Sequence, residues 1–380
     1  MVYASTLSVR LRTFAAAGSL AAAGLITAGP EPAFAQGGAS KEVAWKVQTT
    51  WPQANLLQES PTIMAKAIEE MSGGRLKMEV LSAGVVVPPF EVLDAVHKGV
   101  LDAAHAWPGY WTGKNMAAGL FGPPPAGPFG LGRDEFLSWL HVGGGMELYN
   151  ELLQKELKLN VVAFFTTTLC YWEAFGWFRK PFDTLADLKK MKFRTSGLGL
   201  QMMRGMGVAA VQMPGGEVIP ALERGTIDGA EWAIPSHDIL MGFQNVTKYY
   251  YMPDMRQPPG IQEFLINKSK WDELPADLNA IVKNALLAEI MRMNNASIDL
   301  DSKAIKELVE KHGVKIMRTP EEVLKAQLAA VDKVYEEEAA KNPFFAKVLA
   351  SQREFARRVV PHAAQIRPPL ERAVEHYWSK

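Results

Sequence analysis

One segment of the sequence is nearly repeated, and this repeat constrains the fold more than any other feature. Residues 91–107 read EVLDAVHKGVLDAAHAW, and residues 217–233 read EVIPALERGTIDGAEWA. In each copy apolar residues recur at helical spacing, a glycine ends the helix, and a short strand follows. Two copies of one helix–strand unit predict two similar α/β lobes, with His105 and Glu231 at corresponding strand ends. We therefore expect a ligand cleft between two lobes.

The N-terminal residues form a separate segment. Two arginines precede the apolar run of residues 14–28, and residues 33–35, Ala-Phe-Ala, offer small side chains for cleavage before Gln36. This pattern is typical of a secretory signal peptide, here residues 1–35. A membrane anchor is the alternative, but the run of about 15 residues is shorter than the roughly 20 that a spanning helix needs. Export and cleavage are expected.

The composition argues against nucleic-acid binding and against any feature that needs more than one cysteine. Lys plus Arg equals Asp plus Glu at 41 each, so no broad basic field indicates nucleic-acid binding. Cys170 is the only cysteine, so an internal disulfide and a cysteine-ligated metal site are both excluded. The exported chain must be stabilised by burial of its apolar residues.

The order of expected elements divides the chain into four parts. After the signal peptide, alternating strands and helices predict a first lobe over residues 41–163, built on parallel strands. A long helix is expected there over residues 133–157, with a bend at the three glycines 143–145 as an alternative. The pattern restarts in a second lobe over residues 164–245. Residues 246–275 contain two extended stretches that return to the first lobe or bridge the lobes. Residues 276–380 are periodic long helices that pack across both lobes or meet a second subunit.

Catalytic motifs are missing from the sequence. It contains no G-x-S-x-G elbow, no H-E-x-x-H zinc helix, no P-loop and no G-x-G-x-x-G after a strand. The histidines are scattered singly, which favours packing or surface roles. These absences favour a binding protein over an enzyme.

Two charged residues stand in positions that favour a ligand pocket. Glu173 alternates with Phe175 and Trp177 along an expected strand, so one carboxylate shares a face with two large aromatic rings. A carboxylate there needs a cation or a donor, which favours a pocket wall over a core. Arg194 ends another strand immediately before Thr-Ser-Gly opens a helix, where ligands gather in open α/β sheets. A surface arginine is the alternative.

Beyond these single residues, long motifs resemble a known family. The run KKMKFRTSGLGLQMMRGMGVAAVQMPGGEVIPALERGTIDGAEW, with the first repeat before it and KYYYMP and FLINKSKWDELP after it, strongly resembles substrate-binding subunits of TRAP (tripartite ATP-independent periplasmic) transporters of the DctP type. The resemblance covers most of the mature chain and is strongest to the α-keto acid-binding branch. It implies a two-lobed periplasmic binding protein fold with long C-terminal helices.

The resemblance also implies the residues of the site. In that branch an arginine clamps the substrate carboxylate, which corresponds to Arg194. Two acidic side chains, a glutamine and a tryptophan backbone carbonyl hold a cation; Glu231 and Trp232 match two of these. At the other two positions the chain departs from the branch, because Glu173 stands where glutamine is usual and Gln257 where glutamate is usual. An oxygen-only site for Na⁺ or Ca²⁺ is still expected.

Aromatic residues are expected to line the rest of the cleft. The substrate-binding set implied in this way consists of Arg194, Glu173, Trp107, Tyr110, Tyr171, Trp172 and Trp232. Cys170 and Trp111 add to the bulk. We hypothesise a 2-oxo acid with an apolar or aromatic tail, while the same bulk could instead shrink the pocket to suit pyruvate.

The expected function is periplasmic capture of a 2-oxo monocarboxylate with a cation, by hinge closure, and delivery to membrane permease subunits. We expect that the protein is not an enzyme and that it uses no organic cofactor. The alternatives are a periplasmic metal-dependent enzyme that acts on keto acids, because a cation beside a carbonyl can polarise it, and a ligand-delivery protein for a sensor. Monomer and homodimer, the latter through the C-terminal helices, both stay open.

Overall fold

The computed structural model describes residues 42–169, 173–258 and 260–379. The expected signal peptide, residues 1–35, and the predicted pocket residues Tyr171 and Trp172 lie outside the described residues. Within the described ranges, no helix is both long enough and apolar enough to cross a membrane.

The first sheet has five strands in the order β2-β1-β3-β10-β4. They are β1 (Val43–Thr49), β2 (Leu76–Leu81), β3 (Ala103–Ala106), β4 (Val161–Thr168) and β10 (Ile261–Asn267). The first three are parallel, as the alternation of strands and helices predicts, and β10 runs antiparallel to both of its neighbours. The late strand β10 is therefore inserted between elements that lie far earlier in the chain.

The second sheet has six strands in the order β11-β9-β5-β8-β6-β7. They are β5 (Gly176–Phe178), β6 (Lys192–Arg194), β7 (Ala209–Val211), β8 (Gly229–Ala230), β9 (Tyr249–Met252) and β11 (Lys315–Arg318). Of the two extended stretches expected between residues 246 and 275, β9 lies in this second sheet and β10 in the first.

The two sheets share the same local topology around β3 and β8, and this shared topology corresponds to the sequence repeat. Strand β3 is parallel to β1 and antiparallel to β10, just as β8 is parallel to β6 and antiparallel to β5. The helix before each is α2 (Val92–His97) or α8 (Gly215–Glu223). The glycines between helix and strand, Gly99 and Gly225, have φ of +73° and +71°, a conformation that glycine adopts without strain. The predicted helix–glycine–strand unit is confirmed in both halves.

Helices cover the sheets and connect their strands. The shorter ones are α1 (Leu56–Met71), α3 (Gly127–Gly130), α4 (Arg133–His141), α5 (Gly145–Glu151), α6 (Leu185–Leu188), α7 (Gly197–Gly205), α9 (Pro235–Met241), α10 (Phe243–Val246) and α11 (Lys268–Asp272). Short turns of 3₁₀ type are η1 (Pro89–Glu91), η2 (Pro108–Gly113) and η3 (Met116–Leu120), and a π-helical turn, η4 (Leu152–Glu156), follows α5. The helix expected from residue 133 to 157 is divided where Gly144 takes φ +89°.

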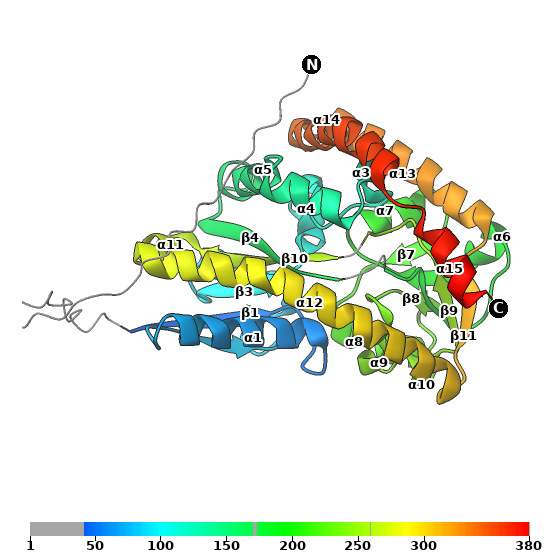
Figure 1. Cartoon of the computed structure of the whole chain (residues 1–380), viewed down its shortest axis with the longest axis horizontal. Helices are drawn as coiled ribbons and strands as arrows, with labels where there is room; N and C mark the ends of the chain where they lie inside the picture. The colour runs from blue at the N-terminus through cyan, green and yellow to red at the C-terminus, as the bar shows by residue number, and fades with distance from the viewer. Residues whose placement is uncertain (1–41, 170–172, 259, 380) are drawn as a thin grey trace, which may run out of the picture. The chain divides into compact units, whose positions relative to one another are not determined.

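Long helices join the two halves of the described body. They are α12 (Ala276–Glu310), α13 (Glu321–Lys341) and α14 (Pro343–Ile366). The short last helix, α15 (Leu370–Trp378), has no buried residue. Figure 1 shows α12 running past both sheets, and it packs on β4 and α1 of the first half and on α9 of the second. The expected two-lobed α/β fold with long C-terminal helices is confirmed.

Candidate functional site

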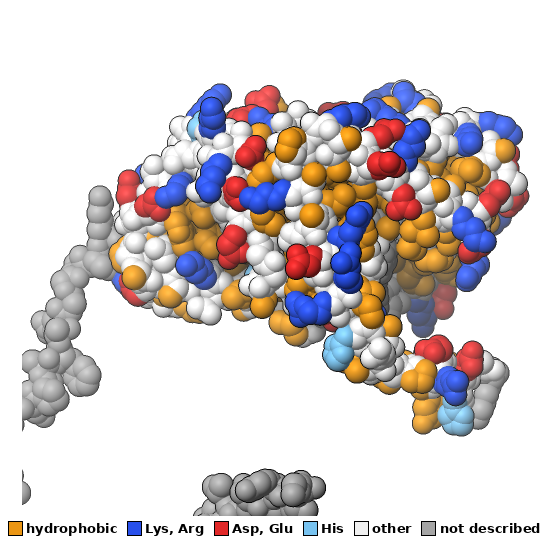
Figure 2. All heavy atoms as spheres, turned by 90° about the horizontal axis from the view of Figure 1, so that it is seen from above, with side chains coloured by type: hydrophobic (Ala, Val, Ile, Leu, Met, Phe, Trp, Pro, Cys, Tyr) orange, Lys and Arg blue, Asp and Glu red, His pale blue; other side chains and the backbone are white. Residues whose placement is uncertain are grey.

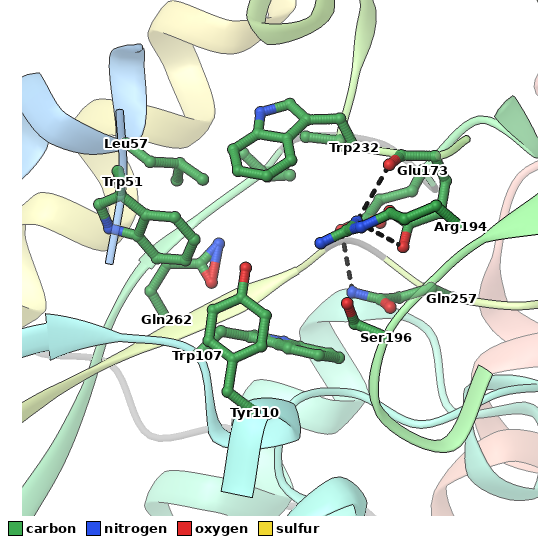
Figure 3. A pocket seen from close by; sticks show the side chains of 13 residues that line it. Trp51, Leu57, Trp107, Tyr110, Glu173, Arg194, Ser196, Trp232, Gln257 and Gln262 are labelled. Atoms are coloured by element: carbon green, nitrogen blue, oxygen red, sulfur yellow. Dashed lines mark hydrogen bonds and ion pairs between the residues drawn. The ribbon is translucent and has the colours of Figure 1, made fainter. Parts of the chain in front are cut away.

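A small cavity of about 30 Å³ lies between the two sheets (Figure 3). The structure brings to its wall seven of the residues proposed from sequence for substrate or cation: Trp107, Tyr110, Glu173, Arg194, Glu231, Trp232 and Gln257. Trp111, which was expected to add to the same cleft, does not line it: its ring is buried and its Nε1 donates to Glu263 at 2.6 Å. They come from the ends of β3, β6 and β8 and from the segments next to β5 and β9. Residues far apart in the chain therefore converge on one enclosed space.

Arg194 is the last residue of β6, and its side chain is only 2% exposed. Its Nε and Nη2 donate to the Met213 carbonyl at 3.2 and 2.9 Å, and its Nη1 donates to the Glu231 backbone carbonyl and carboxylate at 3.1 and 3.0 Å. These four bonds use four of the five guanidinium N–H groups. The fifth, on Nη2, points into the cavity towards the Tyr110 hydroxyl, with which the guanidinium interacts.

Glu231 follows β8 directly, and its backbone amide donates to the Arg194 carbonyl at 3.2 Å. The pairing of β6 with β8 places Arg194 opposite Ala230, so arginine and glutamate are held next to each other by sheet register. The Trp232 ring lies beside this pair, with its centroid 5.7 Å from the Arg194 guanidinium carbon. Strand pairing thus fixes the buried, positively charged Arg194 side chain at the cavity wall.

A second buried arginine, Arg256, was not singled out by sequence analysis. Its Nη2 donates to Glu173 at 3.3 Å and its Nη1 to the Gln257 side-chain oxygen at 3.2 Å. Its Nη1 also lies 3.9 Å from Glu231, and its Nε forms an ion pair with Asp254 at 3.1 Å. The only sequence signal was a charge directly before the proposed ligand Gln257. Where that charge points is decided by the loop after β9.

Glu173 is enclosed by these groups. Gln257 Nε2 donates to its Oε1 at 2.9 Å, while Arg256 reaches its Oε2. Burial raises the pKa of Glu173 well above its ordinary value, and the Arg256 guanidinium opposes that shift. The Glu173 carboxylate, which was expected in the pocket wall, is therefore buried. Its charge is compensated by the guanidinium of Arg256.

The opposite wall is aromatic. Trp51, Trp107 and Tyr110 pack together, with ring centroids of Trp107 and Tyr110 5.3 Å apart. Trp51 also meets Trp232 of the second half edge to face at 6.4 Å. A Cβ on Gly197 would lie 2.6 Å from the Trp107 ring, so this ring packs closely against the start of α7. The two halves are in contact around the cavity.

Tyr110 is the polar group of this aromatic wall. Burial raises the pKa of Tyr110 to about 12, an effect that the neighbouring Arg194 guanidinium opposes. The phenol therefore stays protonated at neutral pH. In Figure 3 its hydroxyl points into the cavity from below, towards the same space that Arg194 enters from the side. A hydroxyl there can donate to an anion that Arg194 attracts.

His105 supports the aromatic wall from behind and does not line the cavity. Its Nδ1 accepts a hydrogen bond from Trp51 Nε1 at 2.7 Å, and its Nε2 lies 3.1 Å from the Thr167 hydroxyl. Because Nδ1 is an acceptor, the ring is neutral, and burial lowers the pKa of His105 to about 3. The strand end that corresponds to Glu231 therefore carries no charge.

Two further polar atoms face the cavity without a partner. Ser196 Oγ and Gln262 Oε1 are buried and accept or donate no hydrogen bond to another described residue. Ser196 precedes α7 without capping it through its side chain, and Gln262 lies on β10. Buried polar atoms usually have partners, so these two indicate a bound polar ligand or water. Sequence analysis missed Gln262 because only the insertion of β10 brings it here.

The donors around Glu173 fit a hard cation chemically. Glu173, Glu231, the Gln257 amide and the Trp232 carbonyl offer only oxygen ligands, the type that Na⁺ and Ca²⁺ prefer. Over the described ranges, no group of three or more His, Cys, Asp or Glu residues is arranged for a metal ion. The guanidinium of Arg256 instead bonds two of the four proposed ligands.

Known proteins match this chain over most of its length. A family model described as bacterial extracellular solute-binding protein, family 7 (DctP) matches residues 47–342. A monocarboxylate 2-oxoacid-binding periplasmic protein of Nostoc sp. (strain PCC 7120) is 31% identical over 83% of this chain and 85% of its own length.

Two solved structures are similar in fold and sequence. A TRAP transporter solute-binding protein from Bordetella bronchiseptica RB50, with copurified calcium and picolinate, has a TM-score of 0.81 and 29% identity over 89% of this chain and 97% of the other. One from Pseudoalteromonas atlantica T6c, with sodium and pyruvate, has a TM-score of 0.80 and 31% identity over 89% and 100%.

These matches agree with the resemblance inferred from the motifs. The family serves transport in the periplasm and is not a family of enzymes, and the similar structures hold a cation together with a carboxylate ligand. With two lobes of one plan and a charged cavity between them, the chain belongs to family 7 of the bacterial extracellular solute-binding proteins, the periplasmic binding components of TRAP transporters.

Proposed function

We propose that this protein binds a small 2-oxo monocarboxylate in the periplasm and delivers it to the membrane permease subunits of a TRAP transporter. The observation that carries the proposal is the buried Arg194 guanidinium, whose one N–H not bonded to Met213 or Glu231 points into the cavity beside Tyr110. A carboxylate in that cavity would accept charge-assisted hydrogen bonds from Arg194 and a further one from Tyr110. The resemblance assigns the clamp to this arginine.

The size of the cavity favours the smaller of the two expected ligand classes. A free volume of about 30 Å³ corresponds to two or three water sites, since one water needs roughly 10–15 Å³ by this measure. Pyruvate would need only a slight opening of the aromatic wall. A branched or aromatic tail would require Trp51 or Trp107 to move away from the second half.

A cation is the second element of the proposal. Glu173, Glu231, Gln257 and the Trp232 carbonyl would hold Na⁺ or Ca²⁺, whose charge would attract the carboxylate and keto oxygens of the ligand. This assignment is supported by the sodium and pyruvate in the Pseudoalteromonas protein and by the calcium and picolinate in the Bordetella protein.

Closure of the lobes links binding to delivery. Contacts of Trp51 with Trp232, and of Trp107 with Gly197, form only when the halves lie close together. A ligand that bridges the halves stabilises this closed state, and the membrane subunits can select it because its surface differs from that of the open state.

Isothermal titration calorimetry tests the proposal. Pyruvate should bind one to one in buffer with calcium or sodium, more tightly than propionate, which lacks the keto oxygen, and than phenylpyruvate, whose tail exceeds the cavity. Pyruvate recovered chemically unchanged after overnight incubation would separate binding from the rival keto-acid enzyme. Absence of binding by any 2-oxo acid would overturn the proposal.

The proposed homodimer would use the last helix. Leu370, Val374, Tyr377 and Trp378 fall on one side of α15 and are between 56% and 82% exposed, and Figure 2 shows the C-terminal segment extending from the body. The Bordetella protein is described as a dimer. Light scattering of the protein with and without residues 370–380 tests this arrangement: a dimer that becomes a monomer on truncation supports it.

A further inference from the structure

Arg256 is placed where it affects the cation more than the ligand. Its side chain is 1% exposed, lies outside the set of residues that line the cavity, and sits behind Glu173 and Gln257. Its five guanidinium N–H groups face acceptors only: Glu173, Gln257, the Ala174 carbonyl, Asp254 and, at 3.9 Å, Glu231. A buried arginine is thus surrounded by the side chains proposed to hold an ion.

The oxygens of the proposed cation ligands are already in use. Glu173 accepts from Gln257 through Oε1 and from Arg256 through Oε2. Gln257 Oε1 accepts from Arg256, and Glu231 Oε1 accepts from Arg194. An ion that binds Glu173 Oε2 and Gln257 Oε1 needs oxygens that now accept from the Arg256 guanidinium. Two positive charges would then share one buried group of ligands.

The guanidinium also has a partner that is not among the proposed cation ligands. Asp254 lies on its far side, with the ion pair to Nε at 3.1 Å, and Gln327 Nε2 donates to Asp254 at 2.7 Å, which fixes that carboxylate. Asp254 can therefore retain Arg256 when its contacts to Glu173 and Gln257 are lost. Burial makes complete removal of the guanidinium from these carboxylates costly.

We propose that Arg256 is an internal competitor of the cation: its guanidinium neutralises Glu173 and Glu231 when no ion is bound, and an ion binds these side chains only by displacing it towards Asp254. This inference rests on the proposed function, because it assumes that the cation is held by Glu173, Glu231 and Gln257. It adds that the chain tunes its own ion affinity through a residue that touches neither ligand nor ion.

Calcium titrations without any 2-oxo acid test the competition. Arg256→Gln removes the competing charge and should bind calcium at least about tenfold more tightly than the unchanged protein, while Arg256→Lys keeps the charge and should stay within about threefold of it. Tryptophan-sensitised terbium luminescence gives a second readout, because Trp232 adjoins the site. Equal or weaker calcium binding by Arg256→Gln would overturn the proposal.

A second pair of variants keeps the test valid if Arg256→Gln alone does not fold. In Arg256→Gln with Asp254→Asn, one buried charge of each sign is removed together, and its calcium affinity is compared with that of Asp254→Asn alone. The same gain of about tenfold is expected, and no gain would again overturn the competition. Pyruvate titrations separate the two proposals: if pyruvate binds but Arg256→Gln gains no calcium affinity, only the role of Arg256 fails, whereas absence of pyruvate binding overturns the proposed function.

Discussion

His105 and Glu231 occupy corresponding positions in the two halves. They differ in charge, and the two walls of the cleft differ in the same way. Glu231 is ionisable and paired with two arginines, and its half supplies charge to the cavity. His105 is neutral, accepts a hydrogen bond from Trp51, and its half supplies aromatic rings. The same topological position thus carries a buried ion pair in one half and supports aromatic packing in the other.

This contrast explains how one architecture can be repeated without making a symmetric site. The charged wall is fixed by strand pairing, because Arg194 and Glu231 are neighbours across β6 and β8. The aromatic wall is carried by Trp51, two residues after β1, and by Trp107 and Tyr110 at the start of η2, positions that are less constrained by sheet register. We therefore expect the charged wall to determine affinity and the aromatic wall to determine stability and closure.

The largest effect is expected on the aromatic wall. Trp107→Ala removes a ring that is 8% exposed and packs against Gly197, so the free energy of unfolding should fall by about 3–5 kcal/mol. Urea denaturation measures this loss, and Trp378→Ala, at a position 82% exposed, is the matched control with little change. A loss below about 1 kcal/mol would show that the wall does not hold the halves together.

On the charged wall the effect should appear in affinity. Arg194→Lys keeps the charge but loses the planar set of donors, so pyruvate should bind about 10- to 150-fold more weakly, or roughly 1.5–3 kcal/mol. Calorimetry of this variant is compared with Arg224→Lys, at an exposed helix end. Unchanged affinity would mean that the anchor of the ligand lies elsewhere.

Acid should destabilise the aromatic wall through His105. Its pKa is about 3 in the folded protein against an ordinary value of 6.5, so only the unfolded chain takes up this proton between those values. The stabilising contribution is complete above pH 6.5 and is lost as pH falls towards 3, by about 2 kcal/mol at pH 5. His105→Gln should remove this part of the pH dependence.

Denaturation at pH 7.5 and pH 5 measures that difference for the unchanged protein and for His105→Gln. His362→Gln, at an exposed position of α14, serves as control. Parallel pH dependences of the unchanged protein and His105→Gln would show that His105 is not the acid-sensitive group of this wall.

The smallest effect is expected where the walls meet. Tyr110→Phe removes one hydroxyl beside Arg194, and pyruvate affinity should fall by about 0.5–1.5 kcal/mol, or roughly two- to tenfold. Thermal stability should barely change, because the ring itself is retained. Tyr377→Phe on exposed α15 is the control, and an affinity equal to that of the control would remove Tyr110 from the ligand contacts.

Much of this contrast was accessible from sequence. The repeat predicted two α/β halves, and Arg194 and Glu231 were both expected at strand ends by the cleft, because helix and strand periodicity are encoded by adjacent residues. That the two are neighbours follows from the pairing of β6 with β8, which the sequence does not show. Arg256 was missed although it precedes a proposed ligand, since its direction depends on the loop after β9. Trp51 and Gln262 were missed because strand pairing between distant segments brings them to the cavity.

The long helix expected over residues 133–157 is broken at the three glycines where a bend was the alternative. Helical periodicity extends over the whole stretch, but Gly144 adopts φ +89° and the chain continues as a second helix and a π-helical turn. Here tertiary packing of Gly143 and Gly145 against Trp139 selects the break that the glycines permit.

A crystal structure with pyruvate and calcium tests the central claim most directly. The account predicts a pyruvate carboxylate oxygen within hydrogen-bond distance of Arg194 Nη2 and of the Tyr110 hydroxyl, with Trp51 and Trp107 closed over the ligand. A structure in which pyruvate lies away from Arg194, or in which that guanidinium keeps only its contacts to Met213 and Glu231 while the cavity holds water, would contradict it.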